Sequence, residues 1–154
     1  MSKVLEIFLD GASSGNPGPS AIGVVIKEND QIIKELSIPI GNATNNIAEY
    51  TAFIYALQEA LILKAEKIRV YTDSELLYNQ WKGLYKVNHP NLKPLFDQIQ
   101  HLVSGLQNIE LLIIPREQNK EADALAKKAI KKEQARVVAF PSLDGREESP
   151  SSEG

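Results

Sequence analysis

The sequence contains no cysteine, which excludes disulfide bonds, zinc sites built on thiolates and cysteine nucleophiles. This composition suits a reducing compartment, and the amino terminus lacks the basic-then-apolar pattern of a signal peptide, so we expect a cytoplasmic protein. Apolar runs long enough to span a bilayer are also missing, and we expect no membrane partner. The glycine-rich segment lacks the Gly-Lys-Ser/Thr sequence of a P-loop, which excludes that class of nucleotide site.

The net charge of -3 is unusual for a protein that binds nucleic acid. The excess of acids lies at the end of the chain: residues 133–154 hold five acids and two bases, whereas residues 1–132 hold 15 of each. We therefore expect one folded domain over residues 1–132, followed by a flexible acidic tail over residues 133–154. The neutral domain permits a nucleic-acid partner but does not require one.

Hydrophobic periodicity predicts the secondary structure. Strands are expected over residues 4–9, 22–27, 32–40, 68–71 and 111–114, and helices over residues 46–63, 74–82, 91–106 and 119–132. Residues 11–20 are too rich in Gly, Pro and Ser for regular structure. Three strands in a meander, followed by alternating helices and strands, predict an α/β protein with one five-stranded mixed sheet and helices on both faces.

Three of these segments carry a more specific prediction. Alternation over residues 32–40, together with Pro39, favours an edge strand. The continuous apolar run at 111–114 is expected of a strand that is covered on both faces. The helix over residues 46–63 has little polar surface and should be buried against the sheet.

Four acids are placed to converge at one end of the predicted sheet. Asp10 and Asp73 each end a predicted strand, while Glu49 and Asp123 each lie in the first turn of a helix. Clustered carboxylates repel one another and need cations, and hard oxygen ligands suit Mg²⁺ or Mn²⁺. Two such ions about 3.5–4 Å apart can activate a water and stabilise the leaving oxygen of a phosphodiester.

Each acid taken singly also has a structural explanation. Asp10 could belong to a turn, and Glu49 could form a capping box with Asn46. Asp73 could cap a helix, and Asp123 could complement a helix dipole.

The segments around these acids resemble the four catalytic blocks of ribonuclease H type 1. The matching segments are Asp10 to Gly18 (DGASSGNPG), Thr44 to Glu49 (TNNIAE), Tyr71 to Ser74 (YTDS) and Asn119 to Ala126 (NKEADALA). They occur in the family's order, and the resemblance covers residues 3 to about 132. The ordered set makes coincidence the poorer explanation for the four acids.

The resemblance implies a ribonuclease H-like fold and endonucleolytic hydrolysis of the RNA strand of RNA–DNA hybrids, giving 5′-phosphate and 3′-hydroxyl products. It implies two Mg²⁺ ions per site, with Mn²⁺ as the alternative, held by Asp10, Glu49, Asp73 and Asp123 as catalytic residues. RNA duplex is a further candidate substrate, and we expect a monomer.

The resemblance also implies a substrate-binding set. Its members are Gly11, Ser13, Asn16, Thr44, Asn45, Asn46 and Lys86. Asn16 and Asn46 resemble residues that contact the sugar-phosphate backbone, and Thr44 resembles part of a pocket for a DNA phosphate. Helix entry for Thr44 and turn chemistry for Asn16 are alternatives that can hold at the same time.

The chain departs from the family pattern in two ways. Many members carry a loop histidine before the last catalytic acid, and here Arg116 and Glu117 are the candidates for a role in that loop. We expect ordinary surface roles for His89 and His101. The basic protrusion of some members is also missing, which predicts weaker, strongly salt-dependent binding.

Two other functions compete with this interpretation. A related proofreading exonuclease would need an acid at position 12, which is alanine. The four intact acids argue against a catalytically idle binding module, and a cleavage assay with Mg²⁺ or Mn²⁺ decides between the two. Gln134, Val137 and Phe140 have the spacing of a weak sliding-clamp motif, but Pro141 replaces its second aromatic. The favoured interpretation is a short apolar stretch that docks on the domain or does nothing.

Overall fold

The computed structural model describes residues 3–139, with side chains through residue 136. The elements along the chain are β1 (Val4–Ser13), β2 (Gly18–Glu28), β3 (Gln31–Ala43), α1 (Asn45–Ile62), β4 (Lys67–Thr72), α2 (Glu75–Trp81), α3 (Lys93–Val103), β5 (Ile109–Ile113), the 3₁₀ turn η1 (Arg116–Gln118) and α4 (Lys120–Ala139). Within this described part, no helix is both long and apolar enough to cross a membrane.

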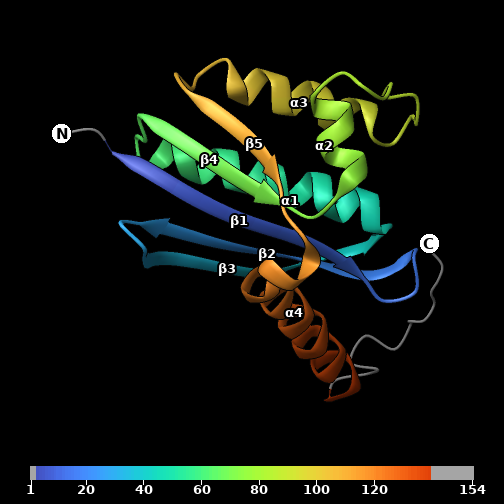
Figure 1. Cartoon of the computed structure of the whole chain (residues 1–154). Coiled ribbons are helices and arrows are strands. Elements are labelled where there is room, and N and C mark those ends of the chain that lie inside the picture. The colour runs from blue at the N-terminus through green and yellow to red at the C-terminus, as the bar shows by residue number, and fades with distance from the viewer. Residues whose placement is uncertain (1–2, 140–154) are drawn as a thin grey trace.

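The strands form one mixed sheet in the order β3-β2-β1-β4-β5. The meander β1–β2–β3 is antiparallel, whereas β4 and β5 join β1 in parallel. Figure 1 shows α1 along one side of this sheet and α4 across the other. The predicted five-stranded mixed sheet with helices on both faces is therefore confirmed, and β3 is at the edge as expected.

The expectation of irregular structure over residues 11–20 is confirmed for residues 14–17 and was wrong for residues 11–13 and 18–20. Strand β1 continues to Ser13 and β2 begins at Gly18, with Ala12 opposite Ala21 and Ser13 opposite Ser20. The local composition disfavours a strand, but pairing across the hairpin supplies the hydrogen bonds that stabilise one. Consequently the hairpin extends well beyond the end of β4.

The expectation for β5 was also wrong. Leu111 is buried, but Leu112 is only half-buried and Ile113 is 40% exposed, so this edge strand is not fully covered on both faces. A continuous apolar run cannot reveal how far each face is covered, because that depends on which elements pack there.

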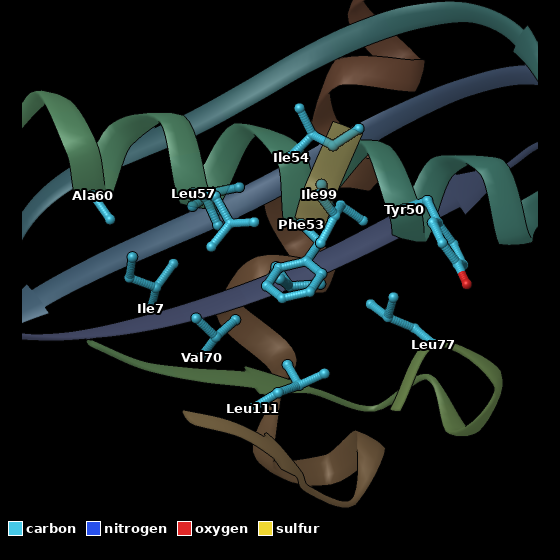
Figure 2. Close-up of a cluster of buried hydrophobic side chains, with 14 of the residues drawn as sticks. Ile7, Tyr50, Phe53, Ile54, Leu57, Ala60, Val70, Leu77, Ile99 and Leu111 are labelled. Carbon is cyan, nitrogen blue, oxygen red and sulfur yellow. The ribbon is translucent and has the colours of Figure 1, made fainter. Parts of the chain in front are cut away.

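The main core lies between α1 and the sheet, as the apolar character of this helix predicts. Figure 2 shows Phe53 and Leu57 of α1 pointing toward Ile7 of β1 and Val70 of β4. These four side chains are fully buried. The helix begins after Thr44, whose hydroxyl accepts a hydrogen bond from the Ile47 amide at 3.2 Å.

Helix α4 continues to Ala139, beyond the end predicted near residue 132. Glu133 and Arg136 form an ion pair of 2.7 Å on this extension. Residues 140–154, which include most of the expected tail and Phe140 of the clamp-like motif, lie outside the described residues. The proposed tail and its role therefore stay predictions.

Candidate active site

Three carboxylates meet beside the end of β4. Oxygen atoms of Asp10, Glu49 and Asp73 all lie within 4.8 Å of one another. Asp10 and Glu49 are buried, and Asp73 is half-buried. The convergence expected from the sequence is thus present for these three acids.

The different lengths of β1 and β4 bring Asp10 to Asp73. Parallel pairing between these strands ends at Phe8 opposite Tyr71, and β4 itself ends at Thr72. Asp73 follows directly, while β1 runs on with Asp10 paired to β2. The expectation that Asp10 ends a strand, and the alternative that it belongs to a turn, were both wrong. Asp10 lies inside β1, where its neighbour β4 has already ended.

Gly11 allows α1 to approach β1 closely enough to deliver Glu49. A Cβ atom at Gly11 would lie 2.3 Å from the backbone carbon of Ala48, so any larger residue would displace the helix. The Gly11 amide donates a hydrogen bond to Glu49 Oε1 at 3.1 Å. The capping alternative for Glu49 was wrong, because Thr44 caps this helix. Glu49 lies one turn further in and faces the cluster.

Gly23 plays the same part for α4 and Asp123. A Cβ atom at Gly23 would lie 2.0 Å from the carbonyl oxygen of Ala122, the residue before Asp123. Gly23 is paired with Asp10 on the sheet, so this close approach places Asp123 next to Asp10. Asp123 also pairs with Lys127 at 3.0 Å. Asp123 also lies in the first turn of α4, where its charge suits the helix dipole. Its place beside Asp10 and the dipole explanation therefore hold at the same time.

Asn119 links the strands to α4. Its Nδ2 donates to the Leu9 carbonyl at 2.8 Å and to Asp73 Oδ2 at 3.0 Å, and its own carbonyl accepts from the Asp123 amide at 3.1 Å. The side chain is 1% exposed, and among the described residues its Oδ1 has no hydrogen-bond partner. The sequence marked Asn119 as a helix start and as the first residue of a family-like segment. Neither feature shows that its side chain is buried against Leu9 and Asp73.

The surroundings of the cluster alter its acidity. Burial, and then the neighbouring carboxylates of Asp73 and Asp123, raise the pKa of Asp10 from its ordinary 3.8 to about 8. Burial and the charge of Asp10 raise the pKa of Glu49 well above its ordinary value of 4.5. Within the described part of the chain, the ion pairs include none with Asp10, Glu49 or Asp73. The cluster therefore lacks a compensating cation from the protein.

Hard carboxylate oxygens at this spacing, buried and without a cationic partner, fit a divalent metal ion. Asp73 is not needed as a helix cap, since the Ser74 hydroxyl caps α2 by accepting from the Leu77 amide at 3.1 Å. The structural alternatives therefore fail for three of the four acids, Asp10, Glu49 and Asp73.

Six of the seven predicted substrate-binding residues, all but Lys86, lie around two adjoining cavities. The first, of about 450 Å³, contains the four acids and is also lined by Gly11, Ser13, Asn45, Asn46, Arg116 and Lys127. The second, of about 180 Å³, is lined by Asn16, Thr44, Asn46, Ile47, His89 and Leu92. Asn46 borders both cavities, so the two sets form a continuous surface.

Short hydrogen bonds fix the rim of this surface. The Ser13 amide donates to Asn45 Oδ1 at 3.0 Å, and the Asn45 amide donates to Asn16 Oδ1 at 2.8 Å. Asn16 has a φ of 35°, as its turn chemistry predicts, and Thr44 starts α1. Both structural alternatives therefore hold without removing these residues from the cavity.

Several placements add to the sequence analysis. His89, expected to have a surface role, lines the cavity that contains Thr44. Arg116 borders the acidic cavity, whereas Glu117 lines a separate one of about 130 Å³ beside Phe8. Lys86 is exposed on the connection between α2 and α3 and lines neither the cavity with the four acids nor the cavity with Thr44.

Comparison with known proteins agrees with this architecture. A family model described as reverse transcriptase-like matches residues 8–129. The bifunctional protein Rv2228c of Mycobacterium tuberculosis is 39% identical over 158 aligned residues, which span all of this chain and 43% of that protein. Ribonuclease HI of Halobacterium salinarum is 40% identical over 127 residues, 82% of this chain and 64% of that protein. The chain thus spans less than two thirds of the length of these relatives.

Solved structures extend the match to three dimensions. The crystal structure of RNase H1 from Halobacterium salinarum superposes with a TM-score of 0.81 at 38% identity, covering 84% of this chain and 98% of that one. LC11-RNase H1, isolated from compost by a metagenomic approach, was crystallised with an RNA/DNA hybrid. That structure superposes with a TM-score of 0.80 at 40% identity, covering 84% of this chain and 99% of that one. The sheet, the acidic cluster and these matches together show that the chain belongs to the ribonuclease H1-like family.

Proposed function

We propose that this chain is a metal-dependent endonuclease that hydrolyses the RNA strand of RNA–DNA hybrids, leaving 5′-phosphate and 3′-hydroxyl ends. The observation that carries the proposal is the cluster of Asp10, Glu49 and Asp73, which lies in an open cavity and forms no ion pair within the described part of the chain. The complex of LC11-RNase H1 with an RNA/DNA hybrid supports this substrate class.

Asp10, Glu49 and Asp73 would hold the metal, with Asp123 as the fourth ligand. We propose two Mg²⁺ ions, with Mn²⁺ as the alternative, because both prefer carboxylate oxygens. When bound, such ions stabilise the negative charge that develops on the phosphodiester oxygens during hydrolysis. The protein's part is to hold the acids in place before substrate arrives, and Gly11 and Asn119 do this through the contacts described above.

The substrate would lie across both cavities. Asn45, Asn46 and the backbone of Gly11 and Ser13 border the acids, where they can contact the strand that is cut. Asn16 and Thr44 border the second cavity, where a phosphate of the DNA strand can lie. Lys86, exposed on the connection that also carries His89, would supply positive charge to the bound strand. A site that requires ribose hydroxyls on one strand and a DNA phosphate on the other would select an RNA–DNA hybrid.

Arg116 is the better candidate for the role of the missing loop histidine, because it borders the acidic cavity and Glu117 does not. RNA duplex is proposed as a secondary substrate. We also propose a monomeric protein in the cytoplasm, the latter on the cysteine-free composition.

Incubating the protein with labelled RNA–DNA hybrid, RNA duplex, DNA duplex and each single strand tests the proposal. Each substrate is tested with Mg²⁺, with Mn²⁺ and with chelator. We expect metal-dependent cuts within the RNA strand of the hybrid, slower cutting of RNA duplex, and none in DNA. Binding of the hybrid without cleavage under any of these conditions would instead identify an idle binding module.

A further inference from the structure

Gln80 is a buried polar side chain on α2 whose amide connects two separate parts of the protein. It is 5% exposed, in a helix whose other buried residue is Leu77. Its Oε1 accepts a hydrogen bond from the hydroxyl of Tyr50 on α1, and its Nε2 donates to the carbonyl oxygen of Lys86 at 3.0 Å. Both ends of the amide are therefore used, and they reach different elements.

The Tyr50 hydroxyl that donates to Gln80 is itself buried. Tyr50 is fully buried, and burial raises its pKa to about 12, so its hydroxyl keeps its proton and can donate. Figure 2 shows Tyr50 at the end of the core near Leu77, with its oxygen away from the apolar cluster. Buried polar groups destabilise a protein unless they are hydrogen-bonded. An apolar side chain at position 80 would leave the Tyr50 hydroxyl and the Lys86 carbonyl without these bonds. The amide at this position therefore serves two partners, the Tyr50 hydroxyl and the backbone of Lys86.

Few other contacts hold the backbone of the connection over residues 82–92 around Lys86. The connection leaves α2 through Gly83, with a φ of 79°, and the amides of Leu84 and Tyr85 both donate to the Asn79 carbonyl. Leu84 and Tyr85 are then 71% and 53% exposed, and Lys86 is exposed as well. Beyond them the chain is anchored again where Val87 and Leu92 pack on the core. Between these anchors, Gln80 is the side chain that holds the carbonyl of Lys86.

The same connection carries two groups suited to a phosphate backbone. Lys86 extends into solvent, and His89 lines the cavity that contains Asn16 and Thr44. The His89 ring accepts from the Asn91 amide through Nδ1 at 3.1 Å, which leaves Nε2 available to a ligand. A loop that is already ordered loses less entropy when it binds, so fixing its backbone in advance raises affinity.

We propose that Gln80, held by Tyr50, is a positioning residue that fixes the 82–92 connection so that Lys86 is presented to the phosphate backbone of the nucleic acid. This inference rests on the proposed function, because it assumes that Lys86 contacts the substrate. It adds a role for two buried residues that touch neither metal nor substrate.

A double-mutant cycle tests the proposal. The binding of RNA–DNA hybrid is measured for the parent, Gln80→Leu, Lys86→Ala and the double variant, all with Asp10→Asn added to prevent cleavage. Losing one phosphate contact lowers the slope of log K against log salt by ~0.9. We therefore expect Gln80→Leu and Lys86→Ala each to weaken binding at 0.1 M salt by roughly threefold to tenfold and to reduce this slope. Because Gln80 acts through Lys86, the double variant should bind no more weakly than Lys86→Ala alone.

Two further variants separate positioning from general stability. Tyr50→Phe removes only the hydroxyl and should weaken binding in the same direction by a smaller factor. Ile68→Val creates a small cavity in β4, at the opposite end of the strand from the acids. This variant should have a lower melting temperature but an unchanged affinity for the hybrid. In cleavage assays without Asp10→Asn, Gln80→Leu should raise KM while kcat stays near the parental value.

Several results would overturn the proposal. Losses from Gln80→Leu and Lys86→Ala that multiply would show that Gln80 does not act through Lys86. Parental affinity in Lys86→Ala would show that this lysine does not contact the substrate, although cleavage by the parent would still support the proposed function. Amide hydrogen exchange without substrate gives a separate check: Gln80→Leu should speed exchange at residues 84–88 but not in the middle of α1. Unchanged exchange there would refute the positioning role even if the protein cleaves hybrids.

Discussion

Replacing Asp10 with asparagine removes one negative charge from the buried acidic cluster and changes the shape of the side chain very little. Asp10 lies with Glu49 and Asp73 within a span of 4.8 Å. Burial, and then the carboxylates of Asp73 and Asp123, raise its pKa to about 8. If the cluster exists to hold metal, the metal-free protein is destabilised by its own charge. Asp10→Asn should then abolish cleavage yet make the metal-free protein more stable.

The pKa shift sets the upper limit of this gain. The folded protein binds the Asp10 proton more tightly than the unfolded chain does, so the metal-free protein loses stability as the pH rises from 3.8 to about 8. Each pKa unit corresponds to about 1.4 kcal/mol, which gives a ceiling of roughly 6 kcal/mol. Glu49 shares the repulsion and the site can relax, so we expect a gain of roughly 1–3 kcal/mol at pH 8, or about 3–10 °C in melting temperature. The gain should vanish near pH 4.

Thermal melts of the parent and of Asp10→Asn, at pH 4 and pH 8 with chelator or with Mg²⁺, measure this effect. At pH 8, Mg²⁺ should raise the melting temperature of the parent more than that of the variant, because the variant lacks a ligand. The reasoning is refuted if the variant is less stable than the parent in chelator at pH 8, or if Mg²⁺ stabilises both proteins equally.

Three further substitutions test how the site is built. Gly23→Ala should push α4 away from the sheet, since the new Cβ would lie 2.0 Å from a backbone oxygen. It should cost roughly 1–3 kcal/mol of stability and reduce cleavage. Gly105→Ala should do neither, because its Cβ would meet a flexible leucine side chain at 3.3 Å and a backbone oxygen at 3.5 Å, an ordinary contact distance. Asn119→Ala removes a donor from Asp73 and should lower kcat as well as cost about 1–3 kcal/mol in denaturant melts; an unchanged kcat would show that the acid needs no such support. Thr44→Ala should cost about 1 kcal/mol through loss of the helix cap and should raise KM for the hybrid. Thr44→Ser should restore both the stability and KM. A KM that the serine hydroxyl does not restore would remove Thr44 from the substrate surface.

The sequence predicted the parts of this protein that depend on local pattern. Strand alternation and helical periodicity follow from which side chains face the core, so the order of elements could be read directly. Acids can be predicted to converge once the strands before them are known to be parallel, and Asp10, Glu49 and Asp73 do converge.

The parts that were missed depend on contacts between distant segments. The β1–β2 hairpin runs through a glycine- and proline-rich stretch because its backbone is paired across the turn, which composition does not reveal. The edge position of β5 depends on strand order, and the roles of Asn119 and Gln80 depend on partners 110 and 30 residues away in sequence, at Leu9 and Tyr50. A lone buried amide carries no periodic signal, so only the fold identifies it.

The central claim is that the acidic cluster makes this chain a hybrid-cutting nuclease, and one assay tests it most directly. Cleavage of an end-labelled RNA–DNA hybrid in Mg²⁺ is compared for the parent, Asp10→Asn and Asp97→Asn, the last being the same change at an exposed acid on α3. We predict that the parent and Asp97→Asn cut the RNA strand at similar rates. Asp10→Asn should cut at least roughly 100-fold more slowly, a larger drop in rate than that caused by removing a residue that only supports a metal ligand. A parent that leaves the hybrid intact, or an Asp10→Asn variant that cuts it at the parental rate, would contradict the claim.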